Sequence, residues 1–301
     1  MKPILLGAMG LIFAAPLVAG ELETSHDNLK QAVQQKDVQA VKKCAAEASA
    51  LARKTIATPA PAGVEAKAAW QKQVAYAKEV SLDSEHALYA TAIQAEPAVL
   101  IDLIATLEKQ NPKSKYLDEA YGPYFEALEG TGAGDKVAAI AEKAIIHQPE
   151  NEDLLLALSD AAMAKRQTAR AAVFAERLIA VMKKHPKPEK VSDADWEYKR
   201  NLALGHAYYA AGMAHSEREQ FAQADQDLRA ASTLVKDEQV LGAILFHLGV
   251  ANYHVGMASG SRARVLEAVK FSEQSAALKT PFTQPATANV QRMREEAARL
   301  R

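Results

Sequence analysis

A near-repeat of eleven residues constrains the fold of this chain more than any other feature. Residues 204–214 read LGHAYYAAGMA, and residues 248–258 read LGVANYHVGMA, 44 positions later. Sliding the sequence by 44 residues without gaps superposes ten identities, most of them small or apolar: Leu204/Leu248, Gly205/Gly249, Ala207/Ala251, Tyr209/Tyr253, Gly212/Gly256, Met213/Met257, Ala214/Ala258, Arg218/Arg262, Ala224/Ala268 and Leu234/Leu278. This pattern predicts two copies of one supersecondary unit.

The repeated units are predicted to be helical. Apolar residues recur every three or four positions, and no β-branched run alternates with polar residues. The apolar fraction of 49% is rich in alanine, and aromatics make up only 6%, which favours closely packed helices. Ser192, followed three residues later by Asp195, is typical of a helix start. Clusters of turn-forming residues predict breaks at 58–63, 130–135, 185–190 and 279–285.

Proline marks a second, earlier periodicity. Pro112, Pro149 and Pro186 each follow an amphipathic segment, and they lie 37 residues apart both times. Because proline cannot continue a helix, it ends each unit at a fixed interval. A fixed period of this size indicates a stacked array of helical repeats.

The repeated residues resemble those of the tetratricopeptide repeat family. Leu204, Gly205 and Tyr208 match the leucine, small residue and aromatic of that family's first helix. The second-helix positions are matched by Ala224, Leu228 and Ala231, then Ala268, Ser275 and Pro281, and earlier by Leu100, Ile104, Leu107 and Pro112, and Val137, Ala141, Ala144 and Pro149. The resemblance covers about residues 81–281. It departs from the family's 34-residue period, and the excess in the last two units falls around 215–220 and 259–264.

The resemblance implies an all-α, right-handed superhelical solenoid of antiparallel helix hairpins. We expect N-terminal helices in residues 21–80, with long helices over 25–56 and 64–80. A solenoid of about five hairpins would follow over 81–284. Residues 285–301 would form a polar-faced helix that caps the last apolar surface.

Residues 1–20 have the pattern of a signal peptide. Lys2 precedes an apolar stretch, and Val18, Ala19 and Gly20 are small residues suited to cleavage before Glu21. The prediction is a periplasmic or secreted protein; an uncleaved anchor is the alternative. No later segment is expected to be apolar for long enough to cross a membrane.

Cys44 is the only cysteine, so no internal disulfide can form. It lies at helical spacing with Val41, Ala48 and Leu51, which predicts a buried small side chain.

Composition and motifs argue against several classes of function. The net charge of −1 does not favour a nucleic-acid partner. The glycine-rich loop at 130–136 lacks the spacing of a phosphate-binding loop, so it is interpreted as a turn. The eight histidines lack zinc-site spacing, and no Gly-x-Ser-x-Gly motif occurs. We therefore expect no cofactor, no metal and no catalysis.

The family resemblance points to a binding surface on the first helix of each unit. The positions carried over are His206, Tyr209, Val250 and Tyr253, with Lys199, Leu202, Phe246 and His254 as neighbouring candidates. The alternative for Tyr209 and Tyr253 is packing between adjacent hairpins, as expected for Tyr208. The paired Lys and Asn with which some family members bind a peptide carboxylate are absent, because Leu202, His206, Phe246 and Val250 stand there.

The expected function is that of a protein-interaction scaffold of the periplasm or cell envelope. A peptide segment or partner helix of unknown identity would bind along the concave groove. The alternative is a small-molecule or glycan binding protein that uses a pocket in the solenoid.

Overall fold

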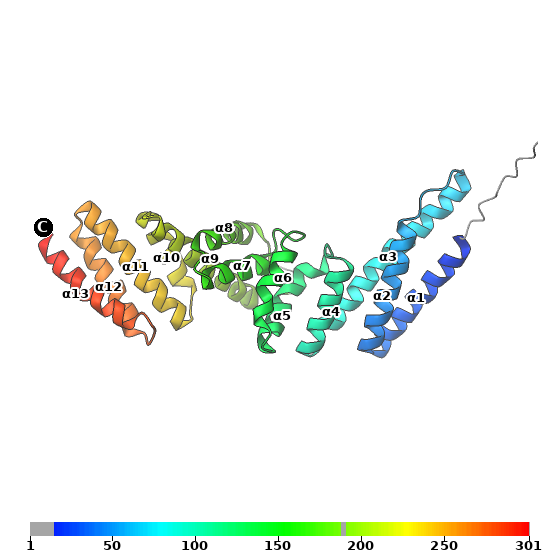
Figure 1. The fold of residues 1–301 in the computed structure, drawn as a ribbon, viewed down its shortest axis with the longest axis horizontal. Helices are drawn as coiled ribbons and strands as arrows, with labels where there is room; N and C mark the ends of the chain where they lie inside the picture. The colour runs from blue at the N-terminus through cyan, green and yellow to red at the C-terminus, as the bar shows by residue number, and fades with distance from the viewer. Residues whose placement is uncertain (1–14, 188–190, 301) are drawn as a thin grey trace, which may run out of the picture. The chain divides into compact units, whose positions relative to one another are not determined.

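The computed structural model describes residues 15–187 and 191–300, with side chains from residue 20 onward. These residues form thirteen α-helices and one short 3-10 helix, and they contain no strand. The all-α class is therefore confirmed. By their contacts, the helices divide into two compact units, Met1–Asp135 and Lys136–Arg301 (Figure 1).

The first unit contains five helices, each packed on the next. The odd-numbered helices also contact one another, α1 with α3 and α3 with α5. The helices are α1 (Ala15–Gln35), α2 (Val38–Ile56), α3 (Val64–Ile93), α4 (Pro97–Gln110) and α5 (Tyr116–Gly130).

The second unit repeats this scheme over eight helices. Successive helices pack together, and α7, α9, α11 and α13 form a second series of neighbours. After the 3-10 helix Gly134–Lys136, the helices are α6 (Val137–Ala144), α7 (Glu152–Ala164), α8 (Thr168–Lys184), α9 (Asp193–Glu217), α10 (Phe221–Leu234), α11 (Glu238–Ser259), α12 (Arg262–Ala277) and α13 (Thr283–Arg299).

The predicted break at 58–63 falls between α2 and α3, and the break at 185–190 follows the end of α8, although residues 188–190 lie outside the described part. The break at 130–135 begins with the last residue of α5 and includes part of the 3-10 helix, and the break at 279–285 extends into α13, which begins at Thr283. The start at Ser192 is confirmed. The Ser192 hydroxyl accepts a hydrogen bond from the backbone N–H of Asp195 at 3.1 Å and donates to its carboxylate at 2.6 Å. The N-terminal prediction needs two corrections. Residues 25–56 are not one helix, because α1 ends at Gln35 and α2 begins at Val38. Helix α3 continues past residue 80 to Ile93, so the boundary expected there lies inside a helix.

The unpredicted break between α1 and α2 is a type of turn that occurs at five helix ends in the described residues. Lys36 has φ +55°, and the backbone N–H of Asp37 donates to the carbonyl of Ala32 at 3.1 Å. This is the Schellman arrangement, in which a left-handed residue closes a helix end. The same arrangement ends α5, α7, α9 and α11, with the left-handed residue at Gly132, Arg166, Glu219 and Gly260. Five odd-numbered helices thus end in one common turn.

The repeat positions form the core of each hairpin. The landmarks of the second helices are buried: Leu100, Ile104, Leu107, Val137, Ala141, Ala144, Ala224, Leu228, Ala231, Ala268 and Ser275. The repeated glycines lie where helices touch. A Cβ atom on Gly256 would lie 2.9 Å from the backbone N of Val265, and one on Gly212 would lie 2.7 Å from Cγ of Leu228. Glycine is therefore required by close helix approach at both copies.

Two further expectations are corrected. In α2 the buried apolar residues are Val41, Ala45, Ala48 and Ala52, whereas Cys44 lies at the edge of this stripe and is only half-buried. This partial burial raises the pKa of the Cys44 thiol. The buried face of α2 is thus rotated slightly about the helix axis from the predicted one.

Helix α11 is long and apolar enough to cross a membrane, contrary to the expectation for segments after residue 20. Half of its apolar window is buried inside the fold, as in a core helix. The predicted signal peptide falls mainly on residues 1–14, outside the described residues, and Gly20 and Glu21 lie within α1.

Candidate functional site

Equivalent residues of α9 and α11 form a row of partly exposed side chains on two helices in contact. We call this row the α9–α11 stripe; it consists of Leu202, His206, Tyr209 and Met213 on α9, and Phe246, Val250, Tyr253 and Met257 on α11. The spacing of four, three and four residues places each set on one face of its helix. Leu202 is the most open, at 41% exposure, and the other seven are half-buried. The stripe is apolar apart from His206.

Lys199 and His206 contact the preceding odd-numbered helix. The Nζ of Lys199 lies 3.0 Å from Oε1 of Glu152 and 2.9 Å from Oδ2 of Asp153, both at the start of α7. Burial lowers the pKa of Lys199, but the two carboxylates outweigh this effect and the net shift is upward. Lys199 therefore ties α9 to α7.

His206 makes a second contact between α9 and α7. The Nδ1 of His206 lies 3.0 Å from Oδ2 of Asp160. The hydrogen bond to Asp160 raises the pKa of His206, and partial burial opposes that shift without cancelling it. His206 is thus a structural contact with a partly exposed edge.

The two repeated tyrosines pack against the two helices that follow each of them. Tyr209 lies against the apolar cluster of α10 and α11, and burial raises the pKa of its hydroxyl. Tyr253 lies against the cluster of α12 and α13, with the guanidinium of Arg292 5.3 Å from its ring centre. Tyr208 contacts the clusters on both sides of α9, as expected of a core residue. The contacts favour packing for both repeated tyrosines, with part of each ring exposed.

Phe246 and His254 point to different neighbours. Phe246 lies 5.2 Å, between ring centres, from Phe282 just before α13. His254 is exposed and stacks on Phe221 at the start of α10, with ring centres 4.1 Å apart and an interplanar angle of 6°. The predicted residues are therefore distributed along a surface and do not converge on one pocket.

His247 is a half-buried imidazole beside this surface. Its ring lies 5.1 Å from Phe246 and 5.8 Å from Phe282, between ring centres. Burial lowers the pKa of His247 to about 4, so the ring is neutral at pH 7. The two methionines of the stripe were not among the predicted binding residues, although the 44-residue register of Tyr209 and Tyr253 includes them.

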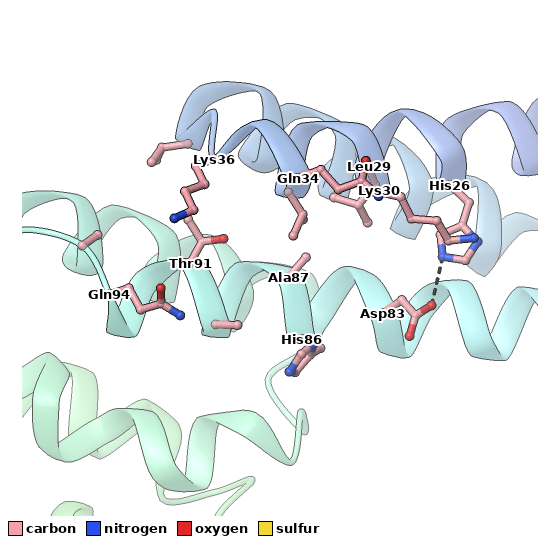
Figure 2. Close-up of a pocket in the computed structure, with 14 residues that line it drawn as sticks. His26, Leu29, Lys30, Gln34, Lys36, Asp83, His86, Ala87, Thr91 and Gln94 are labelled. Atoms are coloured by element: carbon pink, nitrogen blue, oxygen red, sulfur yellow. Dashed lines mark hydrogen bonds and ion pairs between the residues drawn. The ribbon is translucent and has the colours of Figure 1, made fainter.

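The first unit contains an open cleft between α1 and α3 (Figure 2). Its volume is about 660 Å³, and Leu29, Val33 and Ala87 are among the residues that line it. Figure 2 shows His26 of α1 directed at Asp83 of α3 at one end. The Nε2 of His26 lies 2.9 Å from Oδ2 of Asp83, and its Nδ1 lies 3.1 Å from the Tyr76 hydroxyl. This buried imidazole bridges the two helices. No sequence pattern indicates this cleft.

Other candidate chemistry has a structural explanation. Residues 130–136 contain the end of α5, its left-handed turn at Gly132 and the 3-10 helix. Among the described residues, no group of three or more His, Cys, Asp or Glu side chains is placed to hold a metal ion. Comparison with protein-family models and with curated proteins gave no match.

Proposed function

We propose that this chain is a tetratricopeptide-like solenoid that acts as a non-catalytic protein-interaction scaffold. The observation that carries the proposal is the α9–α11 stripe. Two helices present matching, partly exposed side chains in the same register, and seven of the eight are apolar. A peptide segment or partner helix would bury these side chains by packing across both helices.

The contacts of the stripe support a recognition role divided between its residues. Tyr209 and Tyr253 are each fixed by contacts with the two helices that follow, so they offer ring area at little cost in side-chain entropy. Leu202 and Val250 are unlike their counterparts in the other copy, Phe246 and His206. In this proposal the repeated residues support the surface, and the varied residues select the partner.

The N-terminal segment supports export, so the proposed site of action is the periplasm or cell envelope. Fractionation of cells that express the full chain with a C-terminal tag would test this. Recovery in the cytoplasm would contradict the proposed location without affecting the proposed surface.

Site-specific photo-crosslinking tests the surface directly. A photoreactive residue would replace Leu202 in the full chain, and a matched variant would carry it at Leu266 of α12, which has the same 41% exposure. We expect a discrete crosslinked protein from position 202 and none from position 266. Crosslinking from 266 alone would assign the interface to the even-numbered helices and overturn the proposal.

A second candidate function, small-molecule binding, is favoured by the α1–α3 cleft. Its volume of about 660 Å³ falls within the range of roughly 300–1,000 Å³ that is usual for ligand sites.

A further inference from the structure

We propose that the α1–α3 cleft binds an anionic amphiphile, with an acyl chain along its apolar middle and the acidic headgroup beside Lys36. This site lies in the first unit and is independent of the α9–α11 stripe. The inference rests on the distribution of charge and apolar surface along the cleft.

The two ends of the cleft differ in chemistry. Figure 2 shows Lys36, Thr91 and Gln94 at one end and the His26–Asp83 contact at the other. Asp83 is the only carboxylate among the lining residues, and His26 contacts it at 2.9 Å. The exposed Lys36 has no carboxylate within ion-pair distance in the described part of the chain. An ammonium, a hydroxyl and a primary amide together supply hydrogen-bond donors suited to a carboxylate or phosphate oxygen.

The middle of the cleft is apolar on both helices. Leu29 and Val33 come from α1, and Ala87 and Ala90 come from α3. Val33 is 42% exposed, although it faces a cleft that could bury it. The alanines leave room between the helices, because their side chains end at Cβ. Leu29 and Ala87 are already buried, so an alkyl chain placed here would remove water mainly from Val33 of α1 and the half-buried Ala90 of α3.

The length of the cleft sets the size of the ligand. Ten residues separate His26 from Lys36, which corresponds to about 15 Å along a helix. The contact between the buried His26 and the half-exposed Asp83 marks the far end, so a chain of medium length fits and a long one would extend into solvent. A peptide would also bring a row of backbone amides and carbonyls, for which the apolar middle offers few partners. An amphiphile therefore fits better than a peptide.

Lys30 and Gln34 occupy the rim between the two ends. Lys30 lies 3.7 Å from Asp27, and both of these side chains are more than half exposed. This weak surface pair leaves the rim free to adjust to a ligand. The cation at Lys36 therefore remains the principal determinant of headgroup position.

Isothermal titration calorimetry with decanoate tests the site. The full chain should bind one decanoate below the concentration at which micelles form. Butanoate should bind at least about tenfold more weakly because fewer methylene groups are buried. Decylamine, which reverses the headgroup charge, should not bind. Equal binding of decanoate and decylamine would overturn the assignment of the headgroup to Lys36.

Two variants and one control localise the binding. Lys36→Gln should weaken decanoate binding about five- to tenfold, because a partly exposed charged hydrogen bond is lost. Ala90→Leu, at a half-buried lining position, should fill the cleft and abolish binding while Lys36 is retained. Lys54→Gln, on the exposed end of α2, should leave binding unchanged. Circular dichroism would verify that each variant is folded.

Three results would contradict the proposal. The first is the absence of saturable binding to the unmodified chain. The second is decanoate binding that neither Lys36→Gln nor Ala90→Leu changes. The third is tight binding of an acidic peptide of about ten residues that Ala90→Leu abolishes, together with no binding of decanoate. The last result would assign the cleft to a protein partner.

Discussion

In the hairpin of α9 and α10, Lys199 and His206 contact carboxylates of α7. At the matching positions of α11, 44 residues later, stand Ala243 and Val250. The contact between α7 and α9 is therefore made partly by ion pairs, whereas these positions of α11 are apolar. The two copies share their internal packing but join the preceding helix by different chemistry.

Beneath the α9–α11 stripe, the copy in α9 is the apolar one and the copy in α11 is the polar one. Tyr208 packs its ring between two apolar clusters, and its counterpart is the buried Asn252. The amide of Asn252 donates to Asp225 at 2.6 Å, and its carbonyl accepts from Arg264 at 3.0 Å. This network joins α10, α11 and α12. Because buried polar groups need particular partners, each hairpin is specific for its own neighbour. Repeated residues thus build the hairpins, and varied residues determine their order.

The largest expected effect concerns the repeated glycines. Gly256→Ala should lower the free energy of unfolding by about 2–3 kcal/mol, because the new Cβ would meet the backbone of α12. Gly212→Ala should cost less, about 1–2 kcal/mol, because its nearest contact is the Leu228 side chain, which can adjust. Urea titration of both variants measures the difference. Gly130→Ala, with no atom within 4 Å of the new Cβ, is the control. A larger loss from Gly212→Ala would contradict this account of the two copies.

The next effect concerns the ion pairs of α9. Lys199→Ala gives α9 the residue found in α11 and leaves Glu152, only 8% exposed, with His185 at 3.3 Å as its remaining basic partner. We expect a loss of about 1–2 kcal/mol in unfolding free energy, since a buried carboxylate is left poorly compensated. Lys187→Ala is the control, because Lys187 pairs with Asp193, which is 94% exposed. That variant should change stability by less than about 0.5 kcal/mol. Equal effects of the two substitutions would show that the contact with α7 contributes no more than a surface pair.

Sequence patterns predicted the all-helical class and several of the breaks between helices because the signals are local. Apolar spacing marks the faces that pack, and Pro112, Pro149 and Pro186 mark unit ends. The break at Lys36 was not predicted because neither glycine nor proline marks it. Lys36, Arg166 and Glu219 adopt a left-handed conformation that disfavours residues with a side chain, by about 1–2 kcal/mol. Tertiary packing stabilises these turns, and no local pattern reveals them.

The candidate sites were predictable to different degrees. The α9–α11 stripe follows from the register of the two copies, so six of its eight residues were predicted from sequence, and Met213 and Met257 were not. The packing of Tyr209 and Tyr253 depends on the two helices that follow each of them in the chain. The α1–α3 cleft depends on the turn at Lys36 and on the contact of His26 with Asp83, 57 residues away. Such pairings require the folded arrangement of helices, which spacing along the chain does not specify.

The smallest expected effect is a difference in pH dependence between the two copies. Contact with Asp160 raises the pKa of His206 above its ordinary value, and Asp237 contributes in the same direction. The stabilisation by His206 is therefore complete below the pKa of the unfolded chain and is lost as pH rises through the folded pKa. His206→Val, which copies Val250, should remove this dependence. The unmodified chain should lose about 0.5–1 kcal/mol more than the variant between about pH 6 and pH 8, a modest value because Asp160 is nearly half exposed. Urea titrations at both pH values measure it.

Since His26, His185 and His215 are present in both proteins, the difference isolates His206. Asp160→Asn should reduce the same dependence while keeping the imidazole, and an unchanged pH profile in both variants would rule out this ion pair as a titrating contact between α7 and α9.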